Sequence, residues 1–190
     1  SGDGNSIAIG VGAMGNVAND NNVGSGCICI GLNSGGALDG TASNDGTNNT
    51  FIGHLSGKDT TIGKQNTFIG SVSGLTNTEG TLNTFVGDSA GATTITGDRN
   101  TCLGTYSLTT GVSDAISIGY DAINTTPNSC VIGSSVGDYD MSNIRPGNDG
   151  WCDLGTSSNK FKDFYTSGEK KEYVGATNVR INKSIRYTCG

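Results

Sequence analysis

Three consecutive stretches of the chain repeat one phrase: NTFIGHLSGKDTTIGKQ at residues 49–65, NTFIGSVSGLTNTEGTL at 66–82 and NTFVGDSAGATTITGDR at 83–99. They share the frame N-T-F-[IV]-G-x-x-[SA]-G, with a further Gly ten residues after the first. Variants of the phrase end at Gly10, Gly31, Gly104, Gly119 and Gly133. Recurrence at a short period predicts a solenoid, in which each period forms one coil that stacks on the next.

The centre of each phrase is predicted to be a strand. Residue types alternate with a period of two, so Thr50 and Ile52 share one face and Phe51 lies on the other. The face opposite the Thr and Ile positions carries one column: Cys29, Phe51, Phe68, Phe85 and Cys102. We therefore predict an all-β chain that folds as a parallel β-helix or β-roll solenoid over residues 1–137.

An asparagine recurs two residues before each of the central column residues, at positions 49, 66, 83 and 100. Equivalent residues of stacked coils lie about 4.8 Å apart, the spacing between neighbouring strands. These four side chains are therefore predicted to form an Asn ladder along the solenoid.

A coil of 14 to 17 residues is too thin to be stable as an isolated unit, and both faces of its strand are apolar in the central repeats. We expect the solenoid to oligomerise as a homotrimer, with the column of Phe and Cys side chains facing the partner chains. A monomeric solenoid with the Phe rings inside is the alternative.

The composition excludes several classes of protein. Gly supplies 32 of the 190 residues and Pro only 2, while hydrophobic residues make up 33%, which disfavours an enzyme with one large core. Gly does not recur at every third position, so the chain is not collagen-like. A net charge of −6 disfavours nucleic acid as a partner, and no apolar run reaches the roughly 18 residues of a membrane helix. We expect neither nucleic-acid binding nor membrane insertion.

Two phrases resemble a known repeat family. S-I-A-I-G-x-x-A at Ser6–Ala13 and A-I-S-I-G-x-x-A at Ala115–Ala122 are similar to the head repeat of trimeric autotransporter adhesins. The N-T-F-I-G-x-x-x-G form is similar to repeats of phage and large-virus fibre proteins. The resemblance covers residues 1–137 and implies left-handed parallel β-rolls, assembly into trimers and binding to a host surface.

A second resemblance lies near the C-terminus. Asp153–Gly168 reads DLGTSSNKFKDFYTSG and resembles the tail-fibre segment that typically precedes an endosialidase-type trimerising chaperone. The resemblance implies such a chaperone, which we expect to be missing from the 22 residues after Gly168. We expect residues 138–150 to be a connecting loop and 151–190 a small β-rich trimerisation segment. Its packing residues are predicted to be Trp151, Phe161, Phe164 and Tyr165.

Signals of catalysis are weak. Ile52–Gly57 contains the one histidine, His54, and fits the hexapeptide pattern of left-handed β-helix acyltransferases, which use a histidine as general base. Only one such unit occurs per coil, whereas those enzymes have three. Gly10–Gly15 matches GxGxxG, but a turn-forming sequence follows where a nucleotide site needs a helix. We expect no enzymatic activity, no cofactor and no metal site.

The sequence therefore predicts a structural and attachment protein: a trimeric fibre or fibre tip on the surface of a virion. Its partners would be further copies of itself and a host cell-surface receptor or glycan, contacted by the loops at 37–48 and 138–150. A bacterial trimeric adhesin head on the outer surface of a cell is one alternative. A hexapeptide-like acyltransferase that uses His54 is the other.

Overall fold

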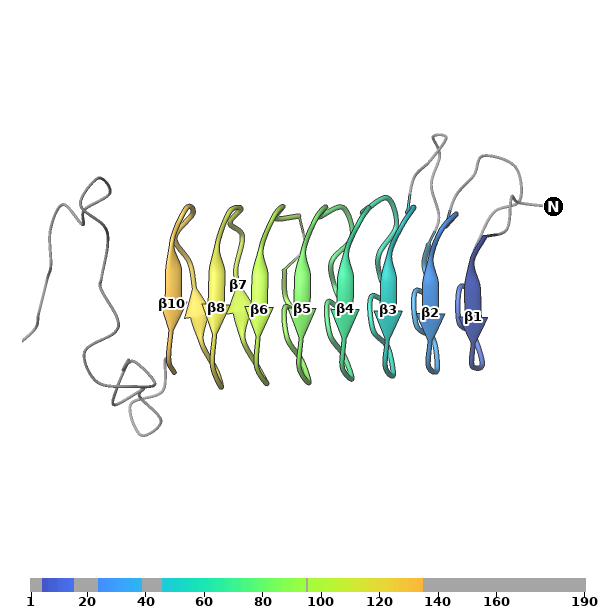
Figure 1. Ribbon diagram of the computed structural model, residues 1–190, viewed down its shortest axis with the longest axis horizontal. Helices are drawn as coiled ribbons and strands as arrows, with labels where there is room; N and C mark the ends of the chain where they lie inside the picture. The colour runs from blue at the N-terminus through green and yellow to red at the C-terminus, as the bar shows by residue number, and fades with distance from the viewer. Residues whose placement is uncertain (1–4, 16–23, 39–45, 95, 135–190) are drawn as a thin grey trace, which may run out of the picture. The chain divides into compact units, whose positions relative to one another are not determined.

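The computed structural model describes residues 5–15, 24–38, 46–94 and 96–134, which together form a stack of coils (Figure 1). The proposed connecting loop at 138–150 and the C-terminal segment at 151–190 lie outside the described residues, as do Trp151, Phe161, Phe164 and Tyr165. Residues 39–45 of the predicted lateral loop also lie outside them. Leu38 and Thr47, on either side of that gap, are buried.

Eight strands form one parallel sheet that runs the length of the stack, in the order β1-β2-β3-β4-β5-β6-β8-β10 (Figure 1). A two-stranded parallel sheet, β7-β9, is formed by the later coils, and no helix occurs among the described residues. The strands of the large sheet are β1 (Ile7–Ile9), β2 (Ile28–Ile30), β3 (Thr50–Ile52), β4 (Thr67–Ile69), β5 (Thr84–Val86), β6 (Thr101–Leu103), β8 (Ile116–Ile118) and β10 (Cys130–Ile132). Those of the small sheet are β7 (Leu108–Thr109) and β9 (Ile123–Asn124).

The register follows the sequence repeat. Phe51 pairs with Phe68, Phe68 with Phe85, and Phe85 with Cys102, while Cys29 precedes them opposite Phe51. Equivalent residues therefore stack directly on one another, and the prediction of an all-β parallel solenoid is confirmed.

The column of Phe and Cys side chains is the core of a single chain. The three rings have no solvent exposure, and their centroids lie 5.1 Å and 4.7 Å apart with interplanar angles of 18° and 5°. The expectation that Phe51, Phe68 and Phe85 face partner chains is therefore wrong, because their own coils cover them. Cys29 and Cys102 extend the same column at its two ends and are equally buried.

Glycines on the facing wall make room for the rings. Gly57, Gly74 and Gly91 each lie against the ring of their own coil, where an added Cβ would come within 3.0 Å of Phe51, Phe68 or Phe85. Each also has φ near +60°, a conformation that L residues adopt only with strain. The coil interior is therefore wide enough for aromatic rings only because the opposite wall carries no side chain there.

The Asn ladder forms as predicted. The Asn66 backbone N–H donates to Asn49 Oδ1 at 2.9 Å, and the pattern repeats from Asn83 to Asn66 and from Asn100 to Asn83. Each Nδ2 group donates in turn to a carbonyl of the next coil, such as Gly80 for Asn66 and Gly97 for Asn83. Every ladder amide thus satisfies one buried donor and one buried acceptor of its neighbour.

The ladder continues beyond the asparagines. Cys27 takes the same position one coil earlier, where its Sγ accepts from the Asn49 N–H at 3.3 Å and donates to the Gly46 carbonyl. Ser6 precedes it and accepts from the Cys27 N–H at 3.1 Å. At the other end Asn100 Oδ1 accepts from the Ala115 N–H. One unbroken relay of hydrogen bonds therefore connects the coils from β1 to β8.

The polar side chains of a second inward column have fewer hydrogen-bond partners. Leu38, Thr60, Asn77 and Thr94 occupy equivalent positions, nine residues after the inward strand residue, and all are fully buried. Thr94 Oγ1 bonds to the Thr109 carbonyl, but both amide atoms of Asn77 and the hydroxyl of Thr60 have no hydrogen-bond partner. A buried polar group without a partner costs about 1–3 kcal/mol.

The two asparagine environments predict opposite effects for one substitution. Asn83→Leu leaves the buried Asn100 N–H and Gly97 carbonyl without partners, so we expect it to lower the free energy of unfolding by roughly 2–6 kcal/mol. Asn77→Leu removes unpaired polar atoms at a position where another coil carries Leu38, so we expect stabilisation of about 1 kcal/mol or more. Chemical denaturation of both variants measures the difference, and equal effects would contradict the ladder.

Glycine substitutions separate backbone strain from steric clash. Gly74 and Gly111 both have positive φ, but an added Cβ meets the Phe68 ring at Gly74 and nothing within 4 Å at Gly111. We expect Gly111→Ala to cost about 1–2 kcal/mol from strain alone. Gly74→Ala should cost several kcal/mol more, because the ring must also shift. Thermal denaturation of the pair is the measurement, and similar losses would show that the wall glycines do not shape the core.

Candidate functional site

The outward side of the eight-stranded sheet is the main candidate surface, called here the outer sheet face. The strand registers place its sixteen positions in two straight columns. The first column contains Ile7, Ile28, Thr50, Thr67, Thr84, Thr101, Ile116 and Cys130. The second contains Ile9, Ile30, Ile52, Ile69, Val86, Leu103, Ile118 and Ile132.

The outer sheet face carries no charged residue. Its second column is aliphatic at all eight positions, and side chains in it retain substantial exposure, such as 58% for Ile9, 37% for Leu103 and 44% for Ile132. The exposed face of a sheet that packs its other face on the core normally alternates to polar residues. This face instead carries threonine and aliphatic residues at every position except Cys130, and an exposed apolar patch of this kind is a candidate interaction surface.

The sequence prediction gave the partner-facing role to Phe51 and its column because both strand faces are apolar in the central repeats and both need to be covered. The structure buries that column inside the chain. The Thr and Ile positions therefore point outward, and none of them is charged in any of the eight strands. Which side faces inward depends on the wall glycines, and their contacts appear only in three dimensions.

His54, the candidate general base, follows Gly53 at the end of β3. Its side chain is exposed at the bend that follows β3, and Leu32 and Ser71 occupy the equivalent positions on the neighbouring coils. The described residues thus place neither an acid nor a second histidine at these stacked positions.

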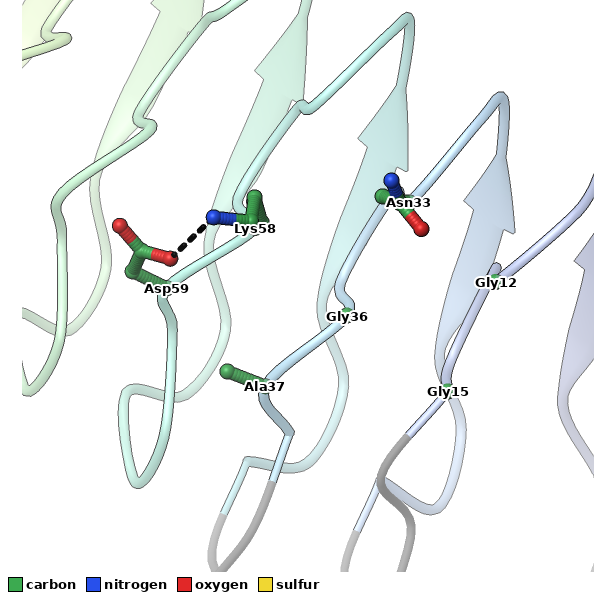
Figure 2. A pocket seen from close by; sticks show the side chains of 7 residues that line it. All are labelled: Gly12, Gly15, Asn33, Gly36, Ala37, Lys58 and Asp59. Atoms are coloured by element: carbon green, nitrogen blue, oxygen red, sulfur yellow. Dashed lines mark ion pairs between the residues drawn. The ribbon is translucent and has the colours of Figure 1, made fainter.

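A shallow hollow lies on the wall of the first three coils (Figure 2). Its volume is about 430 Å³, and small residues line it: Gly12 and Gly15 from the first coil, Gly36 and Ala37 from the second. Asn33 borders it, and Lys58 pairs with Asp59 across 3.3 Å at its other side. Because this exposed ion pair neutralises itself, the hollow offers no net charge or buried polar group that would select a ligand.

Within the described ranges, no group of three or more metal-ligating side chains comes together. The same ranges contain no helix long and apolar enough to cross a membrane. The Gly10–Gly15 stretch forms a bend and turn after β1, and residues 16–23, where a nucleotide site would need a helix, lie outside the described residues.

Comparison with known proteins adds no assignment: no protein-family model matches the chain, and no curated protein matches it.

The buried thiols belong to the core. Burial raises the pKa of Cys29 to about 12 and that of Cys102 to about 11, and it also raises the pKa of Cys27. All three are free thiols with no exposed surface, so Cys29 and Cys102 cannot form disulfide bonds between chains.

Alkylation tests this assignment. A pKa of about 12 in place of 9.0 lowers the thiolate fraction of Cys29 at pH 8 about a thousandfold, and burial blocks the reagent as well. We expect iodoacetamide to leave Cys29 and Cys102 unmodified in the folded protein and to modify both in denaturant, as measured by peptide mass mapping. Rapid modification of either thiol in the native protein would contradict the inward orientation of the column.

Proposed function

We propose that the chain is a structural attachment protein, the repetitive part of a homotrimeric fibre on the surface of a virion, in which the outer sheet face joins the copies. The observation that carries the proposal is the uncharged aliphatic column from Ile9 to Ile132. The aromatic core is already complete within one chain, so this column forms a continuous apolar row on its surface.

The dimensions of the outer sheet face suit a partner of the same kind. Eight strands at about 4.8 Å give a surface roughly 34 Å long and two side-chain columns wide. Contiguous apolar patches of several hundred Å² are at the upper limit of what monomeric soluble proteins expose. Burial of such a surface stabilises an assembly by about 25 cal/mol for each Å² of apolar area removed from water.

A second copy of the same chain is the partner that best fits the outer sheet face. Another copy presents an identical repeat with the same strand spacing, so its aliphatic column matches this one over the whole length. Closed rotational symmetry about an axis parallel to the solenoid keeps every coil level with its equivalent in the partner. The number of three copies follows from the resemblance to adhesin heads, in which three rolls share one axis.

The attachment role rests on the same resemblance and on the arrangement of the coils. With the sheet face covered, the bends that follow the strands remain on the outside of the fibre. The resemblance of Asp153–Gly168 to tail fibres favours a virion over a bacterial surface as the location. A bacterial adhesin head would use the same interface. No observation favours the acyltransferase reading of His54.

Charge placed on the outer sheet face tests the assembly. We expect the native protein to sediment at three times the 19.3 kDa of one chain. The double variant Ile69→Lys and Val86→Lys should sediment as a monomer with unchanged circular dichroism, because both side chains point away from the core. Cys130, in the first column of the same face, should react with iodoacetamide faster in that variant than in the native assembly.

Leu82→Lys is the matched control, since Leu82 is equally apolar and 49% exposed but lies in a bend outside the sheet. It should leave the assembly intact. A native protein that is folded and monomeric would overturn the proposal, and a native dimer would keep the interface but overturn the number of copies.

A further inference from the structure

The described part of the chain contains two tyrosines, and they lie side by side on adjacent coils. Tyr106 follows β6 and Tyr120 follows β8, two strands that pair directly. Their ring centroids are 6.2 Å apart at an angle of 89°, an edge-to-face arrangement. The rings are 47% and 50% exposed, whereas the three phenylalanines of the core are fully buried.

The position of the two rings is fixed by the backbone. Both tyrosines lie in the bends that lead from the large sheet to the small β7-β9 sheet, beyond the strand ends (Figure 1). The Tyr106 N–H donates to the Asp88 carbonyl and the Asp121 N–H to the Thr105 carbonyl, both at 2.9 Å. These bonds join the three successive coils that carry Asp88, Tyr106 and Asp121.

Side chains with acceptor groups occupy the stacked positions next to the two tyrosines. Asp88, Thr105 and Tyr120 stack at one position of successive coils, and Ser89, Tyr106 and Asp121 stack at the next position. Carboxylates accept hydrogen bonds only, while the hydroxyls of Ser89 and Thr105 both donate and accept. Ser89 Oγ donates to Asp88 Oδ2 at 3.1 Å, which holds that carboxylate on the surface.

We propose that this tyrosine patch, formed by Asp88, Ser89, Thr105, Tyr106, Tyr120 and Asp121, binds a neutral saccharide. A pyranose ring has an apolar face of C–H groups that packs on an aromatic ring, and its hydroxyls donate to carboxylates. Two exposed rings one coil apart provide the apolar platform, and the two carboxylates provide the acceptors. The patch contains two acids and no base, so sialylated or sulphated glycans are repelled from it.

This inference rests on the proposed attachment function and names the place where the host surface would be contacted. The bends that carry the patch lie beyond the strand ends, so they do not belong to the outer sheet face. A trimer would present three copies of the patch, and several weak saccharide contacts would then add to a firm attachment.

A glycan array tests the inference with the full chain. Neutral oligosaccharides such as lactose and its extended forms are compared with their sialylated counterparts, for example 3′-sialyllactose. We expect binding to at least one neutral glycan and weaker or no binding to its sialylated form. Titration with that neutral glycan should then show affinity about tenfold or more lower in Tyr106→Ala and in Tyr120→Ala.

Two controls separate stacking from general damage. Tyr106→Phe keeps the ring and should retain most of the affinity, whereas Leu82→Ala changes an exposed apolar side chain far from the patch and should have no effect. Sedimentation of each variant is measured in parallel.

The outcomes distinguish this inference from the proposed function. Absence of binding to every neutral glycan by an intact trimer, or binding that survives both alanine variants, overturns the saccharide site alone. Dissociation of the assembly in the tyrosine variants would also overturn it, because the rings would then be contacts between chains. A monomeric native protein that still binds a neutral glycan through the tyrosines would overturn the trimer and leave the site in place.

Discussion

The structure depends on one relay of hydrogen bonds in which an inward side chain of each coil accepts the backbone N–H of the next. Asn49, Asn66 and Asn83 are its centre, and each also donates to a buried carbonyl of the following coil. Backbone bonds also join neighbouring coils outside the three-residue strands, such as those from the Gly57 N–H to the Ser73 carbonyl and from the Val72 N–H to the His54 carbonyl. The ladder adds two hydrogen bonds per coil at equivalent positions, which fixes the register between neighbouring coils. All the remaining columns of equivalent residues are therefore straight.

Straight columns explain both surfaces of the sheet. Inside, the rings of Phe51, Phe68 and Phe85 stack at close to the strand spacing because the glycines of the facing wall leave room for them. Outside, the Ile and Thr side chains form two uninterrupted rows with no charge. The same repeat that completes the core of one chain thus creates a regular apolar face that matches only a surface of equal period, and another copy of the chain is such a surface.

Much of the fold was predictable because each coil corresponds to one repeat of the sequence. The period, the strands, their parallel register and the Asn ladder all follow from residue types at fixed spacing, and the structure confirms them. The candidate sites were less predictable. Alternation shows that Phe51 and Ile52 lie on opposite faces, but it does not show which face is inward. Likewise, Tyr106 and Tyr120 are fourteen residues apart, and their contact exists only because β6 and β8 are neighbours.

The sequence by itself determined that this protein is a stack of β-coils with Gly at the bends and Asn at the rungs, since these are local requirements of backbone conformation and hydrogen bonding. Only the tertiary structure showed which face of the strands points into the core and which points outward. A coil closes around the rings only where Gly74 and its equivalents meet them across the interior, and that contact joins positions six residues apart through the fold of the coil. Once the rings are inside, the aliphatic column must lie outside, and the surface available to partners follows from that choice.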